Sequence, residues 1–174
     1  MIEIKNLTKS YNGVKVVDNI SLKVNDGEIF AFIGHNGAGK TTTIKSIVGI
    51  NNFDSGDKLE LTKYLGDLIS SYSHGMKQKI ALIAALSHDP KVLIMDEPFV
   101  GLDPKAVFDM KNIMKEMCKE GKCIFFSTHI LDVAEKLCDR VAIIKKGKIV
   151  TVGKMKEIMG DESLEEVFLE LGEN

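Results

Sequence analysis

One short segment of the chain carries residue types that bind phosphate. The run Gly34-His35-Asn36-Gly37-Ala38-Gly39-Lys40-Thr41 satisfies G-x-x-x-x-G-K-[ST], between an apolar run at 28–33 and a helical pattern at 41–48. Glycines let successive main-chain N–H groups turn inward toward phosphate oxygens, and the following helix N-terminus adds partial positive charge. Lys40 is expected to neutralise the β and γ phosphates, and Thr41 to hold Mg²⁺. The other expected contacts to a nucleotide come from Asn36, Gly37, Ala38, Gly39 and Thr42.

An acidic pair follows a second apolar run. Val92 to Met95 has the pattern of a buried strand, and Asp96 and Glu97 come directly after it. Asp96 is expected to reach Mg²⁺ through water, and Glu97 to act as the catalytic residue that polarises the water attacking the γ phosphate. The alternative, a solvated acidic strand end, is disfavoured by the upstream phosphate loop. The sequence therefore predicts nucleotide hydrolysis.

The elements that must position these residues follow from periodicity. Over the first 33 residues apolar and polar types alternate around turns at Asn12-Gly13 and Asp26-Gly27, which predicts a β meander. From residue 28 onward strand and helix patterns alternate, which is typical of parallel βαβ units. The expected strands are 28–33, 92–95, 123–126, 141–144 and 148–152; the expected helices are 41–48, 73–87, 104–120, 131–138 and two short ones near Met155 and Leu164. The predicted class is α/β with a small β appendage.

Composition limits the class of protein. The 174 residues, 44% apolar and 28% charged, are enough for one globular domain, and a net charge of −2 without charge blocks disfavours nucleic-acid binding. Cys118, Cys123 and Cys138 lack Cys-x-x-Cys spacing, which predicts reduced thiols. The start of the chain does not resemble a signal peptide, and no run approaches the roughly 20 apolar residues that span a bilayer. The chain is therefore expected to be cytoplasmic, with any membrane role arising through a partner.

Further motifs resemble those of the nucleotide-binding subunits of ATP-binding cassette (ABC) transporters, over nearly the whole chain. Three segments carry the resemblance: Tyr72-Ser73-His74-Gly75-Met76 with Lys77-Gln78-Lys79 is similar to a degenerate Leu-Ser-Gly-Gly-Gln signature, Gly101-Leu102-Asp103 to the D-loop, and Ser127-Thr128-His129 to the switch-histidine segment. The signature variant looks most like that of ABC-2 type exporters. The resemblance implies ATP and Mg²⁺ as cofactors. It also implies a RecA-like P-loop NTPase core with a small N-terminal antiparallel β subdomain.

The resemblance also implies roles for single residues. Ser73 and Gly75 are expected to donate hydrogen bonds to the γ phosphate of ATP held by a second subunit, which joins two subunits head to tail. The His129 imidazole is expected to contact the γ phosphate and sense its loss, and Asp103 to lie at the nucleotide. Tyr11 is either a platform on which adenine stacks or a strand-end tyrosine packed on the core. The implied partners are a second subunit and a transmembrane permease that holds the chain at the inner face of the membrane.

One part of the family pattern is missing. Lys40 and Ser73 are only 33 positions apart, whereas family members carry further strands, a Gln-bearing loop and a helical subdomain in this interval. The only Gln is Gln78, and Glu60, nominated in place of the loop Gln, has the setting of a solvated helix residue. We therefore expect a single domain over 1–174 with a truncated helical subdomain. A deletion or gap is expected between 56 and 61, whether engineered, natural or caused by residues absent there.

Two functions follow. The first is an ATP-binding and hydrolysing subunit that powers an ABC-type exporter through ATP-driven head-to-tail dimerisation. The second is a shortened nucleotide-binding module with little or no coupled ATPase activity. A soluble ABC ATPase acting on DNA or ribosomes is disfavoured because the chain shows neither a basic groove nor a second cassette. A GTPase is disfavoured because no Asn-Lys-x-Asp motif is present.

Overall fold

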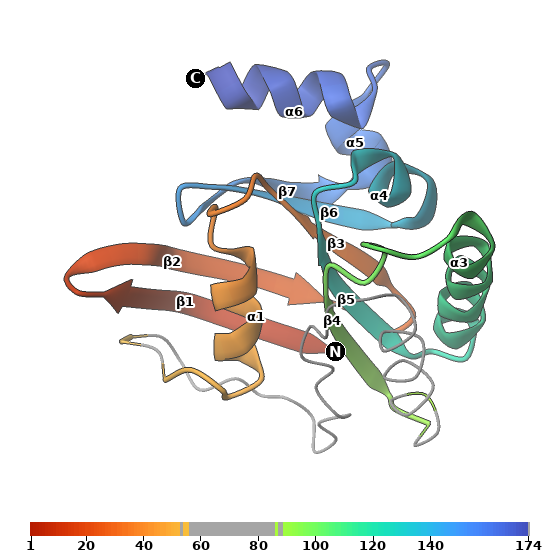
Figure 1. Cartoon of the computed structure of the whole chain (residues 1–174), viewed down its shortest axis with the longest axis horizontal. Coiled ribbons are helices and arrows are strands. Elements are labelled where there is room, and N and C mark those ends of the chain that lie inside the picture. Colours follow the sequence, from red (N-terminus) through yellow and green to blue (C-terminus); the bar gives the residue numbers. More distant parts are fainter. Residues whose placement is uncertain (53, 56–85, 87–88, 174) are drawn as a thin grey trace.

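The computed structural model describes residues 1–52, 54–55, 86 and 89–173 (Figure 1). Its strands are β1 (Ile2–Tyr11), β2 (Val14–Val24), β3 (Ile29–Ile33), β4 (Val92–Asp96), β5 (Cys123–Thr128), β6 (Arg140–Lys145) and β7 (Lys148–Lys154). Its helices are α1 (Lys40–Ile47), α3 (Pro104–Lys119), α4 (Leu131–Leu137), α5 (Met155–Met159) and α6 (Leu164–Glu173). Each agrees with an expected element to within a few residues. The expected helix at 73–87 lies almost wholly outside the described residues.

The central sheet has the strand order β4-β5-β3-β6-β7. The first four of these strands are mutually parallel and β7 runs antiparallel to β6, so the predicted parallel core is confirmed and ends in a hairpin at one edge. The expected N-terminal antiparallel unit is confirmed, because β1 and β2 form their own two-stranded sheet, and β3 joins the parallel sheet, as the pattern from residue 28 onward predicted. The reason is burial: every residue of β3 is buried, so this strand must be covered on both faces.

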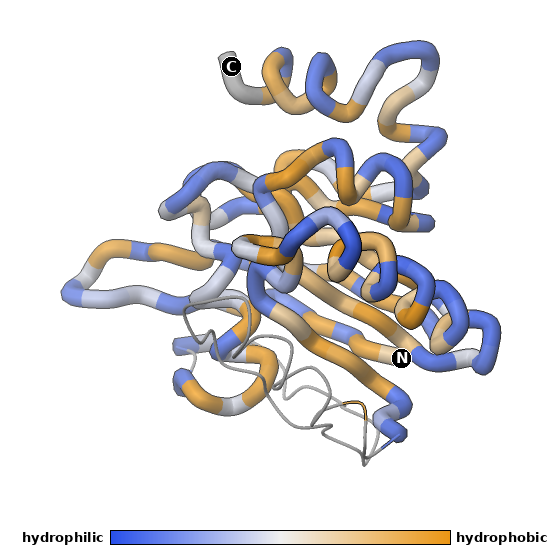
Figure 2. Tube along the Cα trace, turned by 45° about the vertical axis from the view of Figure 1, so that its right-hand side comes forward, coloured by the Kyte–Doolittle hydropathy of each residue, from blue (hydrophilic) through white to orange (hydrophobic). Residues whose placement is uncertain are grey.

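Two apolar layers cover the central sheet, and the alternation of side chains along β3 separates them. Ile29, Ala31 and Ile33 belong to one core cluster, which includes residues of α3, α4, α5 and α6. Phe30 and Phe32 point to the other face and pack with residues of α1, β1 and β2. In Figure 2 the strands at the centre of the molecule are largely hydrophobic, whereas hydrophobic and hydrophilic stretches alternate along the helices around them.

The helix boundaries follow the expected local signals. Asp103 is the N-cap of α3, where its Oδ1 accepts a hydrogen bond from the Ala106 amide at 2.8 Å, and Pro104 opens the helix. Along α3, Met110, Met114 and Met117 form the buried face. The capping chemistry, read locally, therefore placed this helix correctly.

The β6–β7 hairpin holds the loop that connects β3 to α1. The Gly147 amide donates to Ala38 O at 2.9 Å, and Gly147 O accepts from the Asp18 amide at 2.8 Å. Gly147 has φ +80°. A Cβ placed on it would lie 2.5 Å from Val16 O, so glycine is required here for both conformation and space.

The three cysteines are free, as expected. Burial raises the pKa of the Cys118 thiol to about 11 and that of Cys123 to about 12. Burial also raises the pKa of Cys138 well above its ordinary value. The thiols therefore stay protonated and unreactive near neutral pH. Over the described part of the chain, no helix has both the length and the apolar character needed to cross a membrane.

Replacing Gly147 with alanine is expected to lower the free energy of unfolding by about 3 kcal/mol or more, because backbone strain and a clash with Val16 O add together. The matched control is Gly121→Ala, since Gly121 has φ +82° but open space around its Cβ position. The control should lose about 1 kcal/mol, from strain alone. Urea unfolding followed by circular dichroism gives the free energy of unfolding of both variants. Equal losses of stability would contradict the role given to the close contact between residue 147 and Val16 O.

Candidate nucleotide-binding site

The phosphate loop connects a fully buried strand to the start of α1. Gly39 is the N-cap of α1, with φ +110°, a conformation that favours glycine. The first helical hydrogen bond runs from the Thr43 amide to Gly39 O at 2.9 Å. The amides of Lys40, Thr41 and Thr42 precede that bond and have no carbonyl partner within the helix. The loop thus presents the positive end of α1 to any anion placed over it.

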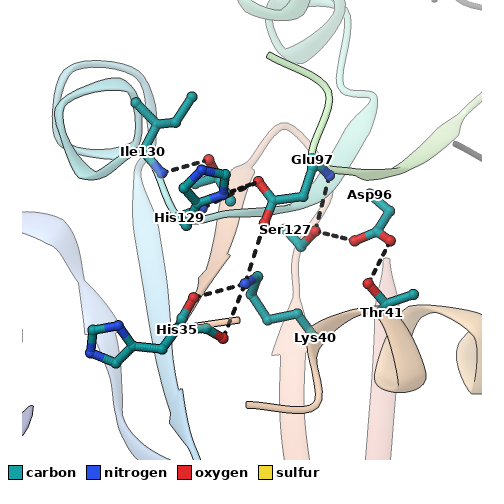
Figure 3. Close-up of polar contacts among 10 residues, drawn as sticks. His35, Lys40, Thr41, Asp96, Glu97, Ser127, His129 and Ile130 are labelled. Carbon is teal, nitrogen blue, oxygen red and sulfur yellow. Dashed lines mark hydrogen bonds and ion pairs between the residues drawn. The ribbon is translucent and has the colours of Figure 1, made fainter. Parts of the chain in front are cut away.

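Lys40 lies beneath this loop with only 6% of its surface exposed. Its Nζ donates to Gly34 O at 2.7 Å and to His35 O at 3.4 Å, and it lies 3.2 Å from Glu97 Oε1 (Figure 3). A buried ammonium is tolerated only when it is paired and hydrogen-bonded. These three contacts satisfy that need and fix the position of the charge.

Thr41, Asp96 and Ser127 form a second group of contacts. Thr41 Oγ1 donates to Asp96 Oδ2 at 2.7 Å, and Ser127 Oγ donates to Asp96 Oδ1. The parallel pairing of β4 with β5 places Asp96 directly opposite Ser127. Ser127 is not among the predicted site residues, although its position two residues before His129 was a signal in the sequence.

Glu97 has φ +50°, which is uncommon for a residue other than glycine and is enriched at functional sites. Its amide donates to Ser127 O at 3.2 Å and to Ser127 Oγ at 3.1 Å. Its carboxylate contacts both Lys40 and His129, with Glu97 Oε2 lying 2.9 Å from His129 Nδ1. The structure therefore brings Lys40, Glu97 and His129 together at the carboxyl ends of β4 and β5, as Figure 3 shows.

The remaining predicted site residues lie around this centre. Tyr11 ends β1 and is 45% exposed, so the interpretation of a tyrosine packed on the core is wrong. Its hydroxyl accepts from Asn51 Nδ2 at 3.0 Å. The Asp103 carboxylate caps α3, and its contact with nucleotide stays a prediction. In the loop, Asn36 and Gly37 are exposed, Ala38 is buried and Thr42 is half-buried. Ser73 and Gly75 lie outside the described residues.

The oxygen atoms beside the phosphate loop suit magnesium. The Thr41 hydroxyl and the Asp96 carboxylate lie within 2.7 Å of each other, and Mg²⁺ prefers oxygen ligands. Within the described ranges, no group of three or more His, Cys, Asp and Glu side chains is placed to hold a metal ion. Mg²⁺ usually binds through one or two protein ligands together with waters and phosphate oxygens.

Comparison with known proteins decides the family. A model of the ABC transporter family matches residues 17–62, and one of an AAA domain (putative AbiEii toxin, type IV toxin–antitoxin system) matches residues 67–134. An uncharacterized ABC transporter ATP-binding protein of Methanocaldococcus jannaschii is 35% identical, across 90% of this chain and 79% of its own length. The chain belongs to the ABC transporter ATP-binding proteins. The bacitracin transport ATP-binding protein BcrA of Bacillus licheniformis, another relative of this ABC subunit, is 31% identical across 86% and 68% of the two chains.

Solved structures confirm the ABC cassette fold, a P-loop NTPase core with a small N-terminal antiparallel sheet. An ATP-binding subunit of an ABC transporter superposes with a TM-score of 0.86 and 27% identity, covering 99% of each chain. A dimeric post-hydrolysis state of the cassette MJ0796 bound to ADP and Pi has a TM-score of 0.72 and 18% identity, across 89% of this chain and 99% of its own. The latter likeness shows the fold alone.

The alignments also bear on the expected shortening of the cassette. The Methanocaldococcus relative aligns over 206 positions, more than the 174 residues of this chain, so it carries residues that have no counterpart here. This agrees with a truncated ABC cassette. The predicted deletion or gap between 56 and 61 lies outside the described residues.

Replacing Ser127 with alanine is expected to lower the free energy of unfolding by about 1–3 kcal/mol, because Asp96 loses a donor and the Glu97 amide loses an acceptor. The control is Ser46→Ala: Ser46 is also fully buried, and its hydroxyl has no hydrogen-bond partner among the described residues. The control should be neutral or slightly stabilising. Denaturant unfolding of both proteins makes the comparison, and an equal effect would show that the Ser127 contacts contribute nothing.

Proposed function

We propose that this ABC subunit binds MgATP at the phosphate loop, hydrolyses it with Glu97 and His129, and powers an exporter by ATP-driven dimerisation. The observation that carries the proposal is the convergence of Lys40, Glu97 and His129 beside the Thr41–Asp96 pair. A buried cation, an oxygen-rich metal position and a carboxylate lie together at one helix N-terminus. Phosphoryl transfer to water requires that combination.

Binding of the triphosphate follows from the loop. Main-chain N–H groups of Asn36, Gly37, Gly39 and the first turn of α1 would donate to phosphate oxygens, while Lys40 neutralises the β and γ phosphates. Mg²⁺, when bound, supplies further neutralisation of the phosphates. Thr41 would hold it directly and Asp96 through water.

Glu97 is the proposed general base. Its carboxylate lies 3.2 Å from the Lys40 ammonium, so a water molecule bound to Glu97 would lie next to the γ phosphate that Lys40 neutralises. His129 contacts the same carboxylate at 2.9 Å and is 47% exposed, which leaves its ring accessible to the γ phosphate. Glu97 would accept the proton of the attacking water, and His129 would orient the carboxylate.

Adenine binding is proposed at Tyr11. Tyr11 is 45% exposed and its hydroxyl accepts a hydrogen bond from Asn51. Lys9 Nζ lies 5.1 Å from the ring centroid, so adenine would stack on the part of the ring that Lys9 leaves accessible. Asp103, at the N-terminus of α3, is the proposed D-loop contact to nucleotide. Both assignments rest on the family resemblance together with these positions.

Dimerisation and transport coupling are proposed from the shape of the site. Thr41 and His129 are exposed, so a γ phosphate bound between them would face solvent on one side. A second copy that donates Ser73 and Gly75 would cover that side, and a cassette of the same fold has been solved as a dimer with ADP and Pi. The similarity to a bacitracin transport ATP-binding protein supports a permease partner, which would hold the chain at the cytoplasmic face of the membrane.

The second candidate is a shortened module that binds nucleotide without useful turnover. The length of the alignment favours this candidate. The Methanocaldococcus relative carries residues that have no counterpart in this chain. Steady-state ATPase activity separates the two candidates. Binding that depends on Lys40, with turnover near background, would favour the module.

Replacing Lys40 with alanine is expected to weaken ATP binding about 100-fold, because the charge-assisted contacts to phosphate are lost. Isothermal titration calorimetry with ATP and Mg²⁺ measures the change. Lys45→Ala is the matched control, since Lys45 is an exposed lysine of the same helix. Chelation of Mg²⁺ should also weaken binding by the wild-type protein. Full affinity in Lys40→Ala would refute the phosphate site.

Replacing Glu97 with glutamine is expected to preserve ATP binding and lower kcat by about 10²–10⁴, because the general base is removed. A nucleotide-dependent dimer should then accumulate, which light scattering with and without MgATP detects. Glu116→Gln, which changes an exposed carboxylate paired with Lys119, serves as the control. Unchanged turnover in Glu97→Gln would exclude Glu97 as the base.

A further inference from the structure

The last helix, α6, is attached at its first turn to the helix that follows His129. The Leu164 amide donates to Glu135 Oε2 of α4 at 2.9 Å, and Leu164 itself is fully buried. Ser163 and Glu166 form a capping box, in which the Ser163 amide donates to Glu166 Oε2 at 2.7 Å and the Glu166 amide donates to Ser163 Oγ at 3.2 Å. The start of α6 is therefore fixed both by packing and by hydrogen bonds.

The other end of α6 is attached to the hairpin that supports the phosphate loop. Lys145 Nζ, at the end of β6, donates to Leu171 O at 3.1 Å. Two residues later, the Gly147 amide donates to Ala38 O of the loop at 2.9 Å. Both ends of α6 are thus linked to segments that flank the nucleotide site.

Between these attachments, α6 contacts the phosphate loop itself. The rings of Phe168 and His35 lie with their centroids 4.7 Å apart at an interplanar angle of 53°, within the range of favourable aromatic pairs. His35 O accepts hydrogen bonds from the Ala38 amide at 3.1 Å and from Lys40 Nζ at 3.4 Å. In Figure 3 the His35 ring points away from Lys40 while its carbonyl points toward it. A contact that holds the ring therefore also holds the backbone that turns over Lys40.

We propose that Phe168 is a positioning residue for ATP binding, acting through its ring contact with His35 to hold the phosphate loop in its binding conformation. This inference rests on the proposed function, because it assigns Phe168 an effect on the ligand of that site. Phe168 is not among the residues predicted to bind the nucleotide. Its effect is preorganisation: a loop already held in place loses less conformational freedom when phosphate binds.

Phe168 also packs against the core cluster beneath α6, so a loss of stability must be separated from a loss of positioning. Three variants of the full chain do this. Phe168→Leu keeps an apolar side chain without a ring, and Phe168→Tyr keeps the ring. Leu169→Ala changes the neighbouring side chain, which is 57% exposed and serves as the matched control.

Calorimetry with MgATP is expected to show a Kd raised about 3- to 10-fold in Phe168→Leu, since one aromatic contact is lost. Phe168→Tyr and Leu169→Ala should bind as the wild type does. His35→Ala should reproduce the loss, and adding Phe168→Leu to it should cause no further weakening, because both changes break one contact. Independent, additive losses, or wild-type affinity in Phe168→Leu, would overturn the inference.

Hydrogen exchange in the absence of nucleotide tests the same contact without relying on ATP binding. Amides of 35–39 should exchange faster in Phe168→Leu, while those of β5 keep their protection. Unchanged exchange in the loop, or faster exchange throughout the protein, would overturn the positioning role. If the wild-type protein gives no heat with MgATP, the proposed function is refuted. If the wild type binds MgATP in a manner that depends on Lys40, and Phe168→Leu binds it with the same affinity, the positioning role alone is refuted.

Discussion

The buried ammonium of Lys40 is the interaction on which the rest of the site depends. With 6% of its surface exposed, it needs acceptors, and it finds them in the carbonyls of Gly34 and His35 and in the Glu97 carboxylate. An unpaired charge at this depth would destabilise the fold by several kcal/mol. The turn of the phosphate loop and the left-handed backbone of Glu97 are therefore parts of one arrangement: each brings an oxygen atom to the same cation.

The parallel sheet makes that arrangement possible. β3 lies between β5 and β6, and β4 pairs with β5. The loops that follow β3, β4 and β5 therefore all leave the sheet at the carboxyl ends of its parallel strands. Because parallel strands point the same way, the carboxyl ends collect the phosphate loop, the acidic pair and the histidine segment. The packing of Phe30 and Phe32 on one face and Ala31 and Ile33 on the other holds β3 in this position.

The contacts that build the site come from 34–41, 96–97 and 127–129. These segments lie at the carboxyl ends of β3, β4 and β5, which are neighbours in the central sheet. The aromatic contact between α6 and His35 adds a link from the end of the chain to the phosphate loop.

The sequence by itself determined the features that depend on neighbouring residues. The alternation of apolar and polar residues predicted the strands, and the capping residue Asp103 with Pro104 predicted the start of α3. The spacing of glycines before Lys40 identified the phosphate loop, because local spacing controls backbone conformation. The resemblance to the ABC family, together with the 33 positions between Lys40 and Ser73, also predicted a shortened cassette. Only the tertiary structure decided three sets of contacts: the bridge from Lys40 through Glu97 to His129, the hydrogen bonds of Ser127 and the contact of Phe168 with His35. Each joins side chains far apart in the chain, where only strand pairing and the packing of α6 bring them within reach.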